Sequence, residues 1–122
     1  ALDYAPHASV FPHAAAVVQH GGVGGCAEAL RAGVPVLTIP VGFDQPDNAE
    51  RLRRMGVGAV LAHTRVDRQA LERSLRAVLA DTAMASRARA VAASMDPDGD
   101  MARTVDAIEA MARRTPVPRA AT

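Results

Sequence analysis

The stretch Ala14–Pro40 reads AAAVVQHGGVGGCAEALRAGVPVLTIP, and it decides the fold. Its first part, Ala14–Gln19, is a short apolar run bounded by turn residues, which predicts a buried strand. Glycines crowd Gly21–Gly25, and the strong helix formers of Cys26–Ala32 follow them. A second apolar run, Val34–Pro40, predicts another buried strand. A strand, a glycine loop, a helix and a strand in this order predict parallel strands joined by a crossover helix.

The flanking segments extend this unit in both directions. Downstream, Asp44 is expected to cap a helix that begins near Pro46 and ends at Met55, and Ala59–Leu61 is expected to form a further strand. Upstream, Leu2–Tyr4 is typical of the end of a short strand. These strands are fewer than the roughly five or six of an ordinary doubly wound domain. The predicted fold class is therefore α/β: a parallel sheet with crossover helices that forms the second half of a Rossmann-like domain.

The second half of the chain is predicted to be helical. Asp67 is expected to cap a helix with one apolar face. The segment Met84–Met111 repeats apolar residues at helical spacing on both sides of a break at Asp96–Gly99. We assign residues 1–113 to one domain with a helical C-terminal part, and 114–122 to a disordered tail.

Composition narrows the classes of function. The 122 residues fit one domain, by the usual range of about 100–200 residues per domain. A net charge of +1, with 1 Tyr, 2 Phe and no Trp, argues against a nucleic-acid partner, which needs a basic surface or stacking aromatics. No apolar run reaches the roughly 18 residues of a membrane span. Cys26 is the only cysteine and no Cys/His cluster has metal-ligand spacing, so we expect no metal site and a cytoplasmic location.

The glycine loop between strand and helix carries the chemistry. Backbone N–H groups at Gly22, Gly24 and Gly25 can approach an anion closely, and the helix N-terminus adds about half a positive charge. His20, at the end of the strand, can donate a hydrogen bond, and Glu28 can accept bonds from ribose hydroxyls. The pattern predicts a diphosphate site. A tight turn beside a core histidine is the alternative interpretation.

The same residues also satisfy a dinucleotide-binding pattern. Gly22–Ala27 matches G-x-G-x-x-G/A, and an acidic residue, Asp44, follows at a suitable distance. Two details count against this interpretation. The acidic residue should lie at the tip of the second strand, but the segment Pro40–Phe43 intervenes. A polar residue, His20, stands where the first strand should run straight into the loop.

A longer pattern spreads over about forty residues: HGGVG at 20–24, EALRAGVP at 28–35, FDQP at 43–46 and NA at 48–49. Together these motifs resemble the donor-binding signature of nucleotide-sugar glycosyltransferases of the two-domain GT-B fold, with bacterial macrolide-type and sterol-type enzymes the most similar. The resemblance covers roughly half of the chain, from Tyr4 to Leu61.

The resemblance implies that several residues bind the donor. The diphosphate would contact His20, Gly22, Gly24 and Gly25, the ribose Glu28, the sugar Asp44 and Gln45, and the base Tyr4 and His7. For the last pair, a buried tyrosine and a surface histidine are the alternative. The resemblance implies no metal or cofactor, because the nucleotide sugar is a substrate. We expect Asn48 and Glu50 to face solvent.

Two positions depart from the family pattern. Many relatives carry Ser or Thr at the position of Gly25 and Thr at that of Cys26. Since Gly25 has no hydroxyl, one phosphate hydrogen bond must come from backbone or water. Cys26 is expected to be a small packed residue; a reactive thiol at the helix N-terminus is the alternative.

The resemblance implies transfer of a hexose from a UDP- or TDP-sugar to an acceptor hydroxyl. In the family the base that deprotonates the acceptor lies on an N-terminal domain, so we expect no catalytic base in these 122 residues. The chain is therefore expected to be a donor-binding half that is inactive alone and needs an N-terminal acceptor domain or a partner subunit. The alternatives are a sugar-nucleotide epimerase, a dinucleotide-binding enzyme fragment, and a non-catalytic donor-binding subunit.

Overall fold

The structure, a computed structural model, describes residues 5–114. Its centre is a sheet of three parallel strands, β1 (Val17–Gln19), β2 (Val36–Thr38) and β3 (Gly58–Val60), which lie side by side in the order of the chain. Pairing joins Val17 to Val36 and Val36 to Gly58. The predicted α/β class with a parallel sheet is confirmed.

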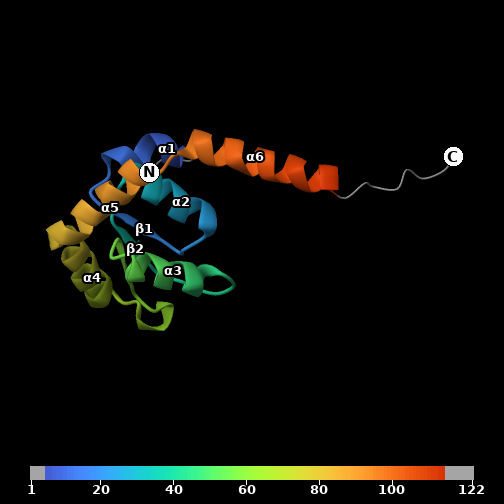
Figure 1. Ribbon diagram of the computed structural model, residues 1–122. Coiled ribbons are helices and arrows are strands. Elements are labelled where there is room, and N and C mark those ends of the chain that lie inside the picture. The colour runs from blue at the N-terminus through green and yellow to red at the C-terminus, as the bar shows by residue number, and fades with distance from the viewer. Residues whose placement is uncertain (1–4, 115–122) are drawn as a thin grey trace.

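Helices connect the strands and cover the sheet (Figure 1). Two of them are the crossovers between parallel strands, α2 (Val23–Ala32) and α3 (Gln45–Arg54). The other helical segments are α1 (His7–Val10), η1 (Phe11–His13), η2 (His63–Arg65), α4 (Arg68–Ala80), α5 (Thr82–Ser94) and α6 (Pro97–Arg114).

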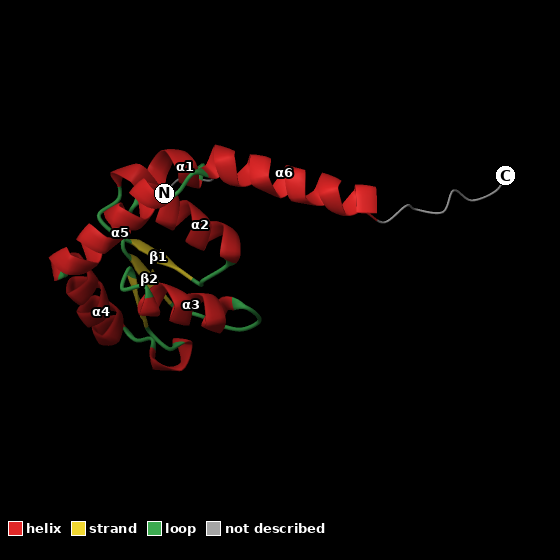
Figure 2. Cartoon of the chain, in the orientation of Figure 1, coloured by secondary structure: helices red, strands yellow, loops and turns green. Residues whose placement is uncertain are grey.

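The alternation of side chains along β2 produces two apolar cores. Val36 packs with Cys26 and Ala29 of α2 and with Leu52 of α3. The next residue, Leu37, packs on the opposite face, in a cluster to which α4 contributes residues. Figure 2 shows the strands between α4 on one side and α2 and α3 on the other. Since both faces of β2 are covered, its three residues are all buried, which explains the continuous apolar run in the sequence.

Helix ends follow the local sequence signals in most places. α2 ends at Gly33, whose φ of 68° is left-handed, and the N–H groups of Gly33 and Val34 donate to the carbonyls of Leu30 and Ala29. The Asp67 carboxylate accepts from the Ala70 N–H at 2.6 Å, so the predicted cap of α4 is confirmed.

The structure differs from the sequence-based expectation in the extent of several elements. β1 and β2 are shorter than the apolar runs that predicted them, and β3 has the expected length but begins one residue earlier, at Gly58. α2 begins at Val23 rather than Cys26, so Gly24 and Gly25 belong to its first turn and not to a loop. The expected strand Leu2–Tyr4 and residues 115–122 lie outside the described residues.

The predicted break at Asp96–Gly99 is narrower than expected, because α6 already starts at Pro97. The Asp96 carboxylate accepts from the Gly99 N–H at 3.1 Å, which caps the new helix. α6 extends away from the sheet (Figure 1), and its apolar residues Met101 and Met111 are exposed. None of the helices within residues 5–114 combines the length and apolar character that crossing a bilayer requires.

Candidate functional site

The glycine turn after β1 lies at the carboxyl end of a parallel strand, the edge at which open α/β sheets bind ligands. Gly21 is buried and has a φ of 98°, a conformation that residues with a side chain rarely adopt. A Cβ at this position would lie 2.8 Å from Thr38 Cγ2 and 3.1 Å from the Gln45 carbonyl oxygen. The turn is therefore packed directly against the end of β2 and the start of α3.

The N-terminus of α2 begins immediately after this turn. Gly22 is the N-cap residue, and its carbonyl accepts from the Cys26 N–H at 3.0 Å. The N–H groups of the first helical turn have no partner within a helix and carry its positive dipole end, which suits an anion. At Gly24, no other atom of the described chain lies within 4 Å of where a Cβ would be, apart from neighbouring residues and the helix backbone. At Gly25, by contrast, the Gln19 side-chain amide fills the place that a Cβ would take.

His20 lies over the same turn. Its side chain is exposed, and its Nε2 atom is 2.7 Å from the place that a Gly22 Cβ would occupy. A side chain at position 22 would therefore displace the imidazole. The structure brings His20 and Gly22 together at the N-terminus of α2, and Gly24 follows in the first turn of that helix.

Gln45 holds the loop that precedes α3. Its Oε1 atom accepts hydrogen bonds from the backbone N–H groups of Val41 at 2.9 Å and Gly42 at 3.3 Å. The backbone N–H of Gln45 donates to the Gly42 carbonyl at 3.2 Å. These bonds close a tight turn over residues 41–45. They occupy the amide oxygen of Gln45 and leave Nε2 as the side-chain group that it can offer to a ligand.

Asp44 does not cap α3 through its side chain, so that prediction was wrong. Its backbone already has helical angles, φ −78° and ψ −12°, whereas a capping side chain needs an extended residue to reach the first-turn N–H groups. Its carboxylate is exposed, and Oδ2 accepts from Asn48 Nδ2 at 2.8 Å.

Asn48 connects the two loops, and the expectation that it faces solvent was wrong. It is half-buried, and its Nδ2 also donates to the Gly21 carbonyl at 2.9 Å. The spacing of four residues between Asp44 and Asn48 on a helix was the available signal, because side chains at that spacing are neighbours. The bond to Gly21 spans 27 residues and had no local signal.

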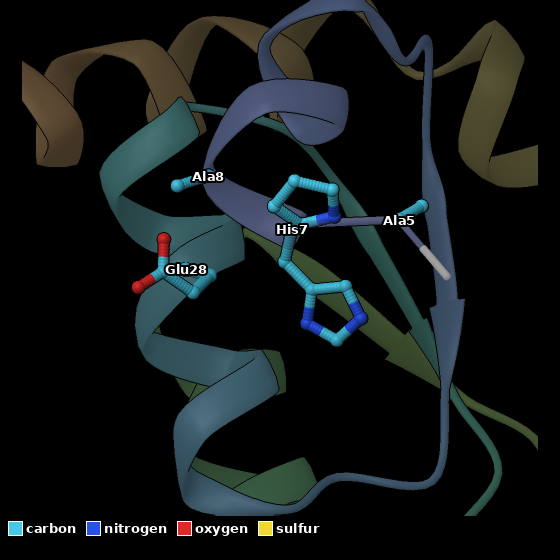
Figure 3. Close-up of a pocket in the computed structure, with 5 residues that line it drawn as sticks. Ala5, His7, Ala8 and Glu28 are labelled. Atoms are coloured by element: carbon cyan, nitrogen blue, oxygen red, sulfur yellow. The ribbon is translucent and has the colours of Figure 1, made fainter.

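A hollow lies between α1 and α2, in addition to the glycine turn and loop described above (Figure 3). It measures about 330 Å³ and is lined by Ala5, Pro6, His7, Ala8 and Glu28. The His7 ring stacks on Phe11, with ring centres 4.7 Å apart. The Glu28 carboxylate accepts from Arg31 Nη1 at 2.9 Å.

His7 and Glu28, which were assigned to the base and the ribose, thus line one hollow. Tyr4, the other residue assigned to the base, lies outside the described residues. Glu28 follows Gly22 by six positions on α2, which separates them by about 9 Å along the helix axis. The two parts of the candidate site therefore lie within two turns of one helix.

Phe43 belongs to the FDQP motif quoted above, but sequence reasoning gave it no role of its own. Its φ of 59° is left-handed, which is uncommon for a bulky residue, and its side chain is 99% exposed. The turn closed by Gln45 holds this conformation at the loop tip, directly before Asp44. Nothing in the local sequence indicates it, since an aromatic residue normally signals burial.

Cys26 is buried in the core between α2 and the sheet, which confirms the prediction of a small packed residue. Burial raises the pKa of its thiol above the ordinary value, and the nearby charge of Asp44 acts in the same direction. A hydrogen bond from Gln19 Nε2 to Cys26 Sγ, at 3.6 Å, lowers the pKa only in part.

Comparison with known proteins places this geometry in a family. Residues 1–111 match the family described as "Erythromycin biosynthesis protein CIII-like, C-terminal domain". The O-mycaminosyltylonolide 6-deoxyallosyltransferase of Streptomyces fradiae is 49% identical over 86 residues, which are 70% of this chain and 20% of that protein.

Solved structures agree with the sequence comparison. The calicheamicin glycosyltransferase CalG4 matches 95% of this chain and 30% of its own, with a TM-score of 0.80 and 30% identity. The glycosyltransferase VinC, solved in complex with dTDP, matches 75% of this chain and 23% of its own, with a TM-score of 0.71 and 30% identity. The chain thus spans between a fifth and a third of the length of these relatives. It belongs to the family of the erythromycin biosynthesis protein CIII-like C-terminal domain, whose structural neighbours are GT-B glycosyltransferases.

Proposed function

We propose that the chain is the nucleotide-sugar donor-binding module of a glycosyltransferase that transfers a hexose from a UDP- or TDP-sugar to an acceptor hydroxyl. One observation carries this proposal. The glycine turn and the Asp44–Gln45 loop meet at the carboxyl edge of the sheet through Asn48. Exposed backbone at a helix N-terminus suits a diphosphate, and a carboxylate beside an amide suits sugar hydroxyls. The similarity to macrolide glycosyltransferases supports the same assignment.

The role of each residue is part of the proposal. His20, Gly22 and Gly24 contact the diphosphate from one surface, and Gly25 contributes through its backbone N–H. Glu28 accepts from the ribose, and the hollow that it shares with His7 receives the base, with Tyr4 stacking on it. Asp44 and Gln45 Nε2 bind hydroxyls of the sugar.

During transfer, negative charge develops on the diphosphate leaving group. N–H groups that already point at this position stabilise the charge without reorganising, and His20 adds a further donor. The base that deprotonates the acceptor is proposed to lie in an N-terminal domain or partner subunit. This chain covers only 20–30% of the length of its glycosyltransferase relatives, which supports that placement. We also propose a bacterial source and a cytoplasmic location, in line with the Streptomyces relative and the single cysteine.

Calorimetry of the 122-residue chain with UDP and dTDP tests the proposal. His20→Ala is expected to weaken nucleoside diphosphate binding by roughly 10- to 150-fold, because a hydrogen bond to a charged group contributes about 1.5–3 kcal/mol. His13→Ala is the matched control, since His13 is exposed and precedes β1, at the other edge of the sheet. Absence of nucleotide binding, or equal affinity of wild type and His20→Ala, contradicts the proposal. Tighter binding of a nicotinamide dinucleotide would favour the dinucleotide alternative.

A further inference from the structure

We propose that Asn48 is a positioning residue that holds the Gly21–Gly22 peptide and the Asp44 carboxylate in their binding orientations at the same time. The inference rests on the proposed function, because it names the residue that organises the same site. It starts from the two hydrogen bonds of Asn48 Nδ2, 2.9 Å to the Gly21 carbonyl and 2.8 Å to Asp44 Oδ2. An amide nitrogen carries two hydrogens, so both are used.

The first bond fixes the direction of a peptide unit. The structure has no cis peptide among its described residues, and in a trans peptide the C=O and N–H groups point in opposite directions. Since the Gly21 carbonyl points at Asn48, the Gly22 N–H points away from it. Gly22 is the N-cap residue of α2, so this N–H is presented at the anion-binding end of the helix.

The Gly21–Gly22 peptide needs an interaction that fixes its orientation. Both residues that flank it are glycines, which have no Cβ to hinder rotation of the peptide between its two orientations. A flipped peptide would present the Gly21 carbonyl oxygen to the diphosphate and repel it. Asn48 holds the orientation in which an N–H is presented instead.

The second bond fixes a carboxylate. Asp44 is exposed and does not cap its own helix, so its side chain would otherwise be free to rotate. With Oδ2 bound to Asn48, the other oxygen keeps one direction and remains available for a sugar hydroxyl. One side chain thereby orders the groups assigned to the two halves of the donor.

The test measures binding of UDP, dTDP and their glucose conjugates to the 122-residue chain by calorimetry. Asn48→Ala is expected to lower the affinity for free nucleoside diphosphates by roughly tenfold or more, because the Gly22 N–H is no longer held toward a charged group. Asn48→Asp keeps the size of the side chain, but its carboxylate cannot donate at pH 7.5 and repels both acceptors, so it is expected to weaken binding further. Asp47→Ala is the matched control, since Asp47 directly precedes Asn48 and pairs only with Arg51 among the described residues.

Two further measurements separate positioning from stability. The amide resonance of Gly22 in ¹⁵N spectra is expected to shift in Asn48→Ala and to stay in place in Asp47→Ala. Asn48→Ala is expected to weaken the binding of free nucleoside diphosphates by the same factor in the wild-type and Asp44→Ala backgrounds.

The outcomes distinguish this inference from the function on which it rests. If the wild-type chain binds no nucleotide, the proposed function fails, and the inference fails with it. If the wild type binds and folded Asn48→Ala binds equally well with an unmoved Gly22 resonance, the inference alone is overturned. A lower melting temperature with unchanged affinity per folded molecule likewise overturns it.

Discussion

Replacing Gly21 by alanine is expected to destabilise the chain by about 2–5 kcal/mol, and the structure separates this effect into two parts. The first part is backbone strain. Gly21 has a φ of 98°, and a left-handed conformation costs a residue with a Cβ about 1–2 kcal/mol. The second part is a steric clash, because the new Cβ would lie 2.8 Å from Thr38 Cγ2. Thr38 is fully buried and cannot swing its methyl group into solvent, so overpacking of about 1–3 kcal/mol is expected.

Urea denaturation followed by circular dichroism measures the total loss in the free energy of unfolding. A second substitution separates the backbone strain from the steric clash. Thr38→Ser removes the methyl group that clashes and leaves the backbone of residue 21 unchanged. In the Thr38→Ser background the loss on Gly21→Ala should therefore fall toward the strain of about 1–2 kcal/mol, with the 3.1 Å contact between the new Cβ and the Gln45 carbonyl oxygen as the steric part that remains. Gly24→Ala is the control, since open space surrounds its Cβ position in α2, and it should be stabilising by up to about 1 kcal/mol. If Gly21→Ala unfolds at the same urea concentration as wild type, the packing of the turn described here is wrong.

Four further predictions concern the site and the surface. Asp44→Ala and Gln45→Ala are expected to leave the affinity for free nucleoside diphosphate unchanged in calorimetry and to lower the affinity for the nucleotide sugar. An equal loss of affinity for both ligands would contradict the assignment of these residues to the sugar. The thiol of Cys26 should react slowly with iodoacetamide at pH 7.5 while folded, because burial and Asp44 raise its pKa, and rapid alkylation of the native chain would argue against this. Hydrogen bonds from Arg53 and Arg54 lower the pKa of Glu50 from 4.5 to about 2, so the stabilisation by these pairs should be present above pH 4.5 and be lost as the pH falls toward 2; an ordinary titration of the Glu50 carboxyl in NMR spectra would refute it. The purified chain should transfer no sugar to any acceptor, and release of nucleoside diphosphate that depends on an acceptor would show that a base is present after all.

The elements around the glycine turn could be predicted because their signals are local. Apolar runs marked β1 and β2, and Gly33 marked the end of α2. The start of α2 could not be placed in this way. Gly24 and Gly25 are poor helix formers, yet α2 includes them, and tertiary contacts of Cys26 and Ala29 with the core outweigh that local preference.

The connections within the candidate site depend on contacts that no local pattern encodes. The residue types of the diphosphate and sugar segments were visible in the sequence, but their junction was not, because Asn48 reaches Gly21 across 27 residues. The role of the Gln45 side chain in closing its own loop was hidden for a similar reason. From the sequence, the Gln45 side-chain amide could equally have faced a ligand. In the fold, its Oε1 atom instead accepts hydrogen bonds from the backbone N–H groups of Val41 and Gly42.

The order of the strands bears on how the chain acquires its structure during synthesis. Each strand pairs with the one made just before it, so the sheet can grow in the direction of translation, through contacts between segments close in the sequence. One face of β2 is largely covered once α2 and α3 have followed their strands, because both helices contribute to the core around Val36, which α5 later completes with Ala88. The opposite face is covered only when α4 follows, because α4 supplies residues to the cluster around Leu37 after the three described strands have been made. A nascent chain that pauses before α4 should therefore carry a formed sheet with one bare apolar face, and that interval is when a chaperone would bind it.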